Sequence, residues 1–262
     1  MKHFSEIKLE KGNIVKESEK VYQCPVCKDQ GVYFKDDMAY ICRCSKKKMT
    51  DVRRDKAGIT PHLAKQTFAS FDPSFYSDEK SADANMTYKE RAIGILNAAK
   101  GFVDEIAKGN NPTGLLFLGG VGSGKTFLAA ACANALVDQG DEVKFIVVPD
   151  FLDEIRDSFQ QSSEVKEGDL MQEVKNVPIL ILDDLGAHNY TDWSIKTLFA
   201  ILNYRVNYEK PTIVTTNLER QQIEELLGSR VHSRLVEACK FYRLENAKDI
   251  RMEKRIREIR KG

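Results

Sequence analysis

The chain has 262 residues, with 40 Lys and Arg against 39 Asp and Glu, so its formal net charge is only +1. Charged residues make up 30% and apolar residues 42%, which is typical of a globular protein and excludes a polycation of the histone kind. No apolar run approaches the roughly 18–20 residues that a membrane helix needs, and the first residues, MKHFSEIKLEKG, include no apolar segment of a secretory signal. The sequence therefore predicts a cytoplasmic protein with no membrane partner.

Four of the six cysteines lie close together, as Cys24, Cys27, Cys42 and Cys44. A cytosolic chain keeps its thiols reduced, so this cluster favours a metal site over disulfides. The C-x-x-C turn lets two sulfurs meet one ion, and residues 32–41 have a hairpin pattern that could return the chain to the second pair. Four thiolates select tetrahedral Zn²⁺ with no open position, which predicts a structural zinc site. An iron–sulfur cluster, a redox dithiol and unliganded thiols are the alternatives.

A basic stretch follows the cysteines. Residues 43–56, RCSKKKMTDVRRDK, carry seven basic residues against two acidic ones. A solvated linker and a contact for DNA or an acidic protein surface both fit this composition. Residues 67–85 then mix aromatic residues with turn formers, which predicts irregular structure. We therefore expect a zinc-binding module with a basic linker in residues 1–65 and a larger domain in residues 66–262.

The larger domain alternates short apolar runs with helical patterns. Apolar residues at helical spacing predict a first helix over residues 86–107. The expected strands are Leu115–Leu118, Val143–Val148, Ile179–Leu182, Thr212–Thr215 and Phe241–Leu244. The expected helices that follow are residues 125–138, 150–160, 193–208, 219–226, 229–238 and 246–260. Continuous runs such as ILIL are typical of strands buried on both faces, so the pattern predicts an α/β fold with a five-stranded parallel sheet between helices.

A glycine-rich loop, GGVGSGKT, lies between the first expected strand and an Ala-rich helix and fits G-x-x-x-x-G-K-[ST]. Glycines let backbone N–H groups surround a phosphate, and the helix N-terminus adds the positive end of its dipole. In such loops the lysine reaches the β- and γ-phosphates and the hydroxyl binds Mg²⁺, so we expect Thr126 to be a Mg²⁺ ligand. The alternative is a glycine-rich turn that binds nothing. The residues expected to hold ATP or ADP are Gly119, Gly120, Val121, Gly122, Ser123, Gly124, Lys125 and Thr126.

Polar side chains end two further apolar runs. The run ILIL is followed by Asp183, predicted to hold Mg²⁺, and by Asp184, predicted to orient or deprotonate the attacking water. The run TIVTT ends at Asn217, which we expect beside the Asp183 strand, where its side chain could bond the water or a γ-phosphate oxygen. The alternatives are a solvated turn for the two carboxylates and a helix cap for Asn217.

These motifs together resemble the AAA+ ATPases, and within them the DnaC/DnaI group of replicative helicase loaders, with the IstB transposition ATPases as close relatives. The resemblance rests on GGVGSGKT, LDDLG, TTNL, GSRVHSRL and the cysteine module, and it covers about residues 65–262. It implies that Arg234 is an arginine finger for a neighbouring subunit, with Arg230 as the second candidate, and that Arg251 contacts the γ-phosphate of its own subunit. An exposed basic helix face is the alternative for Arg230 and Arg234.

The resemblance also implies a function. It is that of an ATPase which loads a hexameric replicative helicase onto single-stranded DNA, self-associates through its ATPase domain, and grips the helicase with its N-terminal module. Asp184 stands where most AAA+ proteins have Glu, so we expect slow, partner-regulated hydrolysis. The sequence ends one helix after the fifth strand, which matches loaders that have no C-terminal lid. An IstB-like transposition helper and a non-hydrolysing nucleotide-switch adaptor are the alternative functions.

Overall fold

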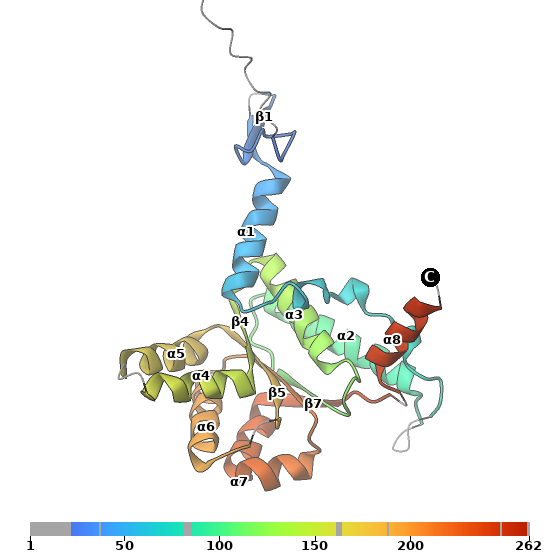
Figure 1. The fold of residues 1–262 in the computed structure, drawn as a ribbon, viewed down its shortest axis with the longest axis vertical. Helices are drawn as coiled ribbons and strands as arrows, with labels where there is room; N and C mark the ends of the chain where they lie inside the picture. Colours follow the sequence, from blue (N-terminus) through green and yellow to red (C-terminus); the bar gives the residue numbers. More distant parts are fainter. Residues whose placement is uncertain are drawn as a thin grey trace, which may run out of the picture. The chain divides into compact units, whose positions relative to one another are not determined.

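The chain divides into two compact units, Met1–Met49 and Thr50–Gly262 (Figure 1). The first 21 residues of the expected N-terminal module lie outside the part of the chain described by the computed structural model. The described residues are 22–36, 38–80, 85–160, 164–187, 189–246 and 248–260, with the side chains of 158–160 and 164–167 left out.

The division falls between residues 49 and 50, before the position expected near residue 65, because the segment after Met49 packs with the larger unit. Asn134 is 1% exposed and joins this segment to the helix that follows the phosphate loop. Its side-chain amide donates to the carbonyls of Leu63 and Gln66 at 2.8 and 2.9 Å, and its Oδ1 accepts from Arg54 Nε at 3.0 Å. These contacts span about 70 to 80 residues of sequence, so composition alone does not reveal them.

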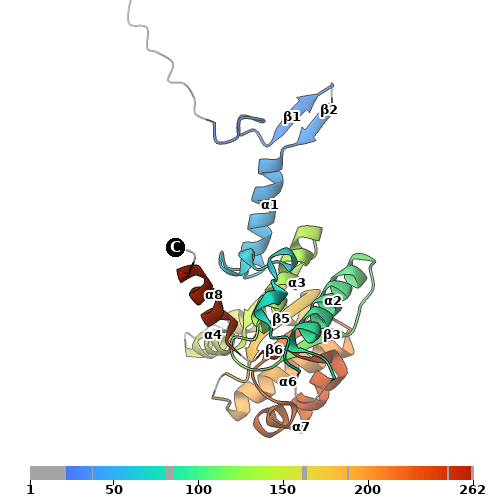
Figure 2. The same ribbon diagram turned by 90° about the vertical axis from the view of Figure 1, so that its right-hand side faces the viewer.

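The smaller unit contains the expected hairpin, made of β1 (Val32–Lys35) and β2 (Met38–Ile41), which Figure 2 shows clearly. The strands pair antiparallel with Val32 opposite Ile41. The basic stretch then forms α1 (Arg43–Lys56), a helix with no buried residue. Because no apolar face marks it, the sequence pattern did not predict this helix.

The larger unit is built on a parallel five-stranded sheet, in the order β4-β5-β6-β3-β7. Its strands are β3 (Gly114–Leu118), β4 (Val143–Val147), β5 (Ile179–Leu185), β6 (Thr212–Thr216) and β7 (Cys239–Arg243). The predicted α/β class and five-stranded parallel sheet are therefore confirmed. The order sets β6 between β3, which leads into the phosphate loop, and β5, which ends in the two carboxylates.

Helices cover both faces of this sheet (Figure 1). The helices are α2 (Tyr88–Ala107), α3 (Lys125–Gln139), α4 (Val148–Gln160), α5 (Glu164–Asn176), α6 (Asp192–Asn207), α7 (Arg220–Ala238) and α8 (Ile250–Ile259). Single 3₁₀ turns lie at Phe68–Ser70 and Pro73–Phe75, within the segment expected to be irregular, and at Leu63–Lys65, just before it. The expected pair 219–226 and 229–238 forms α7, which is kinked at Gly228 by a φ of 82°. Helix α5 was not expected.

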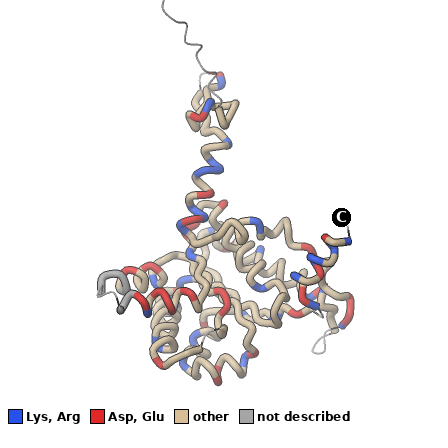
Figure 3. The backbone as a smooth tube through the Cα atoms, viewed as in Figure 1, with Lys and Arg blue, Asp and Glu red and all other residues tan. Residues whose placement is uncertain are grey.

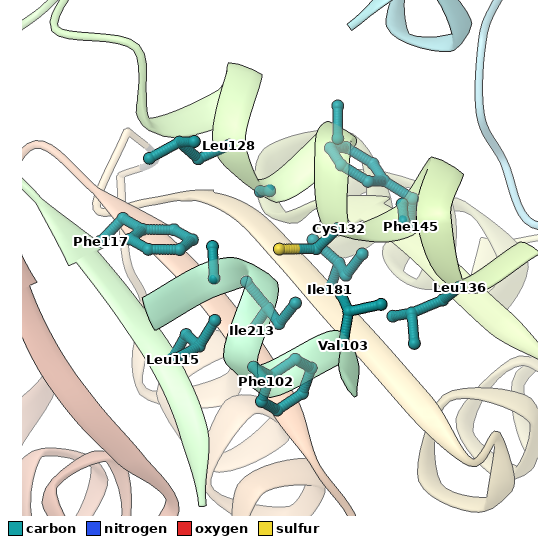
Figure 4. Close-up of a cluster of buried hydrophobic side chains, with 14 of the residues drawn as sticks. Phe102, Val103, Leu115, Phe117, Leu128, Cys132, Leu136, Phe145, Ile181 and Ile213 are labelled. Carbon is teal, nitrogen blue, oxygen red and sulfur yellow. The ribbon is translucent and has the colours of Figure 1, made fainter. Parts of the chain in front are cut away.

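Side chains alternate between the two faces along each strand, as a fully buried parallel sheet requires. Figure 4 shows one face, where Leu115 and Phe117 of β3 meet Phe102 of α2 and Leu128 and Cys132 of α3. The intervening β3 residues belong to the cluster on the other face, which α4, α6 and α7 cover. Both layers hold the strand ends, and therefore the site, in fixed positions.

Charge is unevenly distributed although the net charge is near zero (Figure 3). Helix α4 carries four acidic residues against one basic residue, whereas α8 carries four basic against two acidic. Within the described part of the chain, no helix has the length and apolar character needed to span a membrane.

A buried guanidinium ties the second helical layer to the sheet. Arg205 of α6 is 1% exposed, and its Nε donates to Thr212 Oγ1 at 2.9 Å. Its Nη atoms donate to backbone carbonyls that end α5 and precede β5 and β6, at 2.7 to 3.3 Å. These carbonyls belong to Val174, Lys175, Val177, Pro178 and Pro211.

We predict that Arg205→Met lowers the free energy of unfolding by about 3 kcal/mol or more, because each buried acceptor left without a donor costs about 1–3 kcal/mol. Urea denaturation measures this change. The matched control is Arg156→Met, since Arg156 is 56% exposed and forms a surface ion pair with Asp153, and an exposed pair contributes less than about 1 kcal/mol. Equal losses in the two variants would contradict the account.

Candidate nucleotide-binding site

The loop between β3 and α3 has a backbone that requires glycine at several positions. Gly119, Gly122 and Gly124 have φ values of 143°, 72° and 100°. A Cβ on Gly119 would lie 2.0 Å from the Leu244 carbonyl oxygen, and one on Gly122 would lie 2.2 Å from the Asp249 carboxylate. The loop is therefore held tightly between β3 and the start of α8, in a form that only glycine permits.

Two buried side chains donate hydrogen bonds to the backbone of this loop. Lys125, the first residue of α3, is 6% exposed, and its Nζ donates to the carbonyls of Gly119 and Gly120 at 2.8 and 2.7 Å. The Tyr76 hydroxyl, which is buried, donates to the Ser123 carbonyl at 2.7 Å. Three loop carbonyls thus accept hydrogen bonds from these two side chains. The ammonium group of Lys125 lies at the N-terminus of α3, where phosphates bind in loops of this kind.

The two carboxylates at the end of β5 meet hydroxyl and amide groups of β6. Thr215 Oγ1 donates to Asp183 Oδ1 at 2.6 Å, and Asn217 Nδ2 donates to Asp184 Oδ1 at 3.2 Å. The Thr126 hydroxyl lies close enough to Asp183 to lower the pKa of that carboxyl, so a hydroxyl oxygen and carboxylate oxygens lie together beside the phosphate loop. Hard oxygen ligands of this kind suit Mg²⁺, which binds through few protein groups plus phosphates and water. Thr126 and Asp183 could therefore hold that ion.

A cavity of about 970 Å³ joins these groups. Its walls include Lys125, Asp183, Asp184, Asn217 and Arg251, so the structure brings together residues predicted from four separate segments. Arg251 comes from the first turn of α8, whose N-terminus is capped by the Asp249 carboxylate accepting from the Arg251 N–H at 2.7 Å. The volume is ample for a nucleoside triphosphate.

The charged groups of the cavity act on one another. Burial lowers the pKa of Lys125 to about 8, with nearby Asp184 and Asp183 opposing this change and Arg251 adding to it. Burial raises the pKa of Asp183, while hydrogen bonds from Thr215 and Thr126 lower it. The lysine, the two carboxylates and the arginine that line the cavity thus lie close enough to influence one another's charge.

The two candidate finger arginines lie elsewhere. Arg234 Nη1 bonds Glu237 at 2.6 Å, and Arg230 lines a separate hollow of about 180 Å³ between α6 and α7. Neither belongs to the cavity wall. An arginine that acts in a neighbouring subunit would not line its own cavity, so the predicted role in trans stays a prediction.

The structure adds cavity residues that the sequence patterns did not single out. Phe71, Phe75 and Tyr76 line the cavity from the segment expected to be irregular. Helix α8 contacts this segment through Arg257, whose guanidinium lies 4.0 Å from the centre of the Phe75 ring, and Lys254, whose Nζ lies 5.5 Å from it. The aromatic residues in that stretch were the available signal, because aromatic side chains in a polar loop need a partner surface.

A second candidate site lies in the smaller unit. The four sulfurs of Cys24, Cys27, Cys42 and Cys44 all lie within 4.8 Å of one another. Cys24 and Cys42 are 3.7 Å apart, Cys27 and Cys44 are 3.3 Å apart, and the Gly31 N–H donates to Cys27 Sγ at 3.3 Å. Sulfurs at metal–sulfur distances of about 2.3 Å in a tetrahedron are about 3.8 Å apart, so this cluster could bind one metal ion.

Comparisons of sequence and of structure with known proteins both find replicative helicase loaders. The chain is 30% identical to the replicative helicase loader DnaC of Escherichia coli (strain K12) over 146 residues, 56% of this chain and 58% of that protein. It is 30% identical to the replicative helicase loader DnaI of Bacillus subtilis (strain 168) over 161 residues, 55% of this chain and 50% of that protein. The aligned part thus spans little more than half the length of these curated relatives. A crystal structure of the DnaC helicase loader is 26% identical, with a TM-score of 0.56 over 71% of this chain and 99% of that one.

The family model for IstB-like ATP-binding proteins matches residues 64–254. This range contains the phosphate loop, the carboxylates of β5, Asn217 and Arg251. The stretch that matches the family model therefore spans these cavity residues. The chain belongs to the family of IstB-like ATP-binding proteins.

Proposed function

We propose that this chain is an ATP-dependent loader that places a hexameric replicative DNA helicase on single-stranded DNA when replication begins. The observation that carries the proposal is the likeness to DnaC, which is found both in sequence and over 71% of the chain in structure. The cavity supports it, because a phosphate loop, paired carboxylates, a polar strand tip and an arginine converge there.

In the proposed ATPase site, Lys125 and the loop N–H groups bind the β- and γ-phosphates, and Thr126 and Asp183 hold Mg²⁺. Mg²⁺ would neutralise charge on the phosphate oxygens when bound. Asp184 orients or deprotonates the attacking water, Asn217 bonds the water or the γ-phosphate, and Arg251 adds positive charge in cis.

The length and the hydrogen bonding of the Asp184 side chain fit slow hydrolysis. This side chain is one CH₂ group shorter than that of Glu, and its Oδ1 already accepts a hydrogen bond from Asn217 at 3.2 Å. We propose that hydrolysis accelerates when DNA or the helicase changes this pairing. Arg234 then acts on the site of a neighbouring copy, so self-association through the ATPase domain is part of the proposal.

The four-cysteine cluster is proposed to hold Zn²⁺, and the unit around it is proposed to grip the helicase. The sulfur spacings fit a tetrahedral ion, and a small unit of this kind buries too little apolar surface to be stable alone. Because all four positions are thiolates, the metal would be structural and not catalytic.

A transposition helper of the IstB kind is the second candidate, since the family model that matches the chain is the IstB-like one. Both proteins would use the same ATPase core. A helper of this kind would bind double-stranded DNA and a transposase, so binding to double-stranded but not single-stranded DNA would favour it.

We predict that Lys125→Ala reduces ATP hydrolysis by at least about 100-fold, because it removes a buried positive charge from the transition state. Asp183→Asn is expected to have a similar effect through weakened Mg²⁺ binding. A phosphate-release assay with and without single-stranded DNA measures both variants.

The control for this assay is Lys108→Ala, since Lys108 is 64% exposed and its ammonium group forms a surface ion pair with Glu105, outside the cavity. Its rate should equal that of the unchanged protein. If Lys125→Ala kept full activity, the assignment of the site would be wrong. If the unchanged protein bound nucleotide but released no phosphate, the non-hydrolysing adaptor would be the better assignment of function.

A metal assay tests the cysteine cluster. The unchanged protein should contain a single zinc ion per chain, and the double variant Cys27→Ser, Cys42→Ser should contain none, as measured by elemental analysis. Cys132→Ala is the control, because Cys132 is fully buried in the ATPase core and should not affect zinc content. Iron in place of zinc, or zinc retained in the double variant, would refute the assignment.

The same double variant tests the docking role. Capture of a hexameric replicative helicase should be lost, because the unit proposed to bind it loses its metal. Nucleotide affinity should stay within about twofold, because the cysteine cluster and the nucleotide cavity share no residues. Full helicase capture by the zinc-free protein would show that another surface binds the helicase.

A further inference from the structure

The end of β5 departs from regular pairing at the two carboxylates. The parallel register between β5 and β6 shifts between Leu182 and Leu185, so Asp183 and Asp184 lie in a bulge. Asp184 has a φ of 59°, in the left-handed region, which costs a residue other than glycine about 1–3 kcal/mol. Such a conformation persists only where surrounding contacts hold it.

The hydroxyl of Thr215 supplies that contact. Thr215 is 1% exposed, and its Oγ1 accepts from the Asp184 N–H at 2.9 Å while lying 2.6 Å from Asp183 Oδ1. Because a backbone N–H can only donate, the hydroxyl proton is left to point at the Asp183 carboxylate. One side chain thus orients the first carboxylate and pins the backbone of the second.

The neighbouring hydroxyl has a different task. Thr216 Oγ1 donates to the Leu185 carbonyl at 2.6 Å and accepts from the Leu218 N–H at 3.0 Å. Both of these bonds run to backbone groups on the far side of the bulge and not to a carboxylate. Of these two threonines, it is therefore Thr215 whose hydroxyl bonds Asp183 and Asp184.

We propose that Thr215 is a positioning residue for ATP hydrolysis. Its hydroxyl fixes one oxygen of Asp183, so that the second oxygen stays directed at the Mg²⁺ site, and it holds the backbone turn that places the Asp184 carboxylate beside Asn217. The proposal rests on the ATPase function proposed above.

The variant Thr215→Val tests it, since valine keeps the shape and the β-branch but has no hydroxyl. We expect the kcat for ATP to fall about 10–100-fold, as is typical when a group that orients a metal ligand is lost. KM for ATP should change less than about threefold, because the loop that binds the phosphates is untouched. The Mg²⁺ concentration for half-maximal rate should rise.

The conservative variant Thr215→Ser keeps the hydroxyl and should restore kcat to within about threefold of the unchanged protein. A measurement without turnover accompanies it: the gain in affinity for a fluorescent, non-hydrolysable ATP analogue on adding Mg²⁺ should shrink in Thr215→Val and persist in Thr215→Ser. A purely structural role for the side chain would not alter this Mg²⁺ dependence.

Thr212→Val is the matched control on the same strand. It also removes a buried hydroxyl, but that hydroxyl bonds Arg205 and the Lys210 carbonyl, at the other end of β6. It should lower the thermal midpoint at least as much as Thr215→Val and leave kcat within about twofold. An equal loss of kcat in Thr212→Val would mean that stability, not positioning, controls the rate.

Two further outcomes would overturn the proposal: an unchanged kcat and Mg²⁺ dependence in Thr215→Val, or a Thr215→Ser variant as impaired as Thr215→Val. Failure of the underlying function is distinguishable, because it shows as activity that survives in Lys125→Ala. In that case the phosphate released would not come from this site, whatever Thr215 does.

Discussion

Burial of one parallel sheet on both faces is the constraint on which the rest of the molecule depends. Parallel strands all end at the same edge, and helices on both faces hold those ends in place. The order β4-β5-β6-β3-β7 then sets β6 between the strand of the phosphate loop and the strand of the carboxylates. Lys125, the two carboxylates of β5 and Asn217 meet in one cavity because of this strand order, although they are far apart in the sequence.

The cavity combines rigid and strained parts. Lys125 and Tyr76 bond the carbonyls of the phosphate loop, and Arg205 bonds the backbone that precedes β5 and β6. Against this fixed background Asp184 keeps a left-handed backbone, held by Thr215 and Asn217. The energy of that conformation, about 1–3 kcal/mol, is small beside the burial of the sheet. A strained backbone at Asp184, held by a rigid surrounding structure, suits the proposed ATPase whose rate depends on binding of a partner.

Much of this could be predicted from the sequence, and the gaps have physical causes. The apolar runs predicted all five strands, and the motifs predicted the main cavity residues, because burial and phosphate binding each leave local patterns. Helix α5, EVKEGDLMQEVKN, escaped because its few apolar residues form no continuous stripe. The roles of Tyr76 and Thr215 escaped because their partners lie 47 and 32 residues away in sequence. The boundary at residue 49 differed from expectation for the same reason, through the bonds of Asn134.

The central claim is that ATP bound in this cavity drives loading of a replicative helicase. The most direct measurement incubates the full chain with a hexameric replicative helicase and circular single-stranded DNA, and counts the helicase rings retained on the circles after removal of free protein. The account predicts retention that requires this chain and its own nucleotide site, so that Lys125→Ala gives only the background found with helicase alone. Equal retention with Lys125→Ala, or none with the unchanged chain and its cognate helicase, would contradict it.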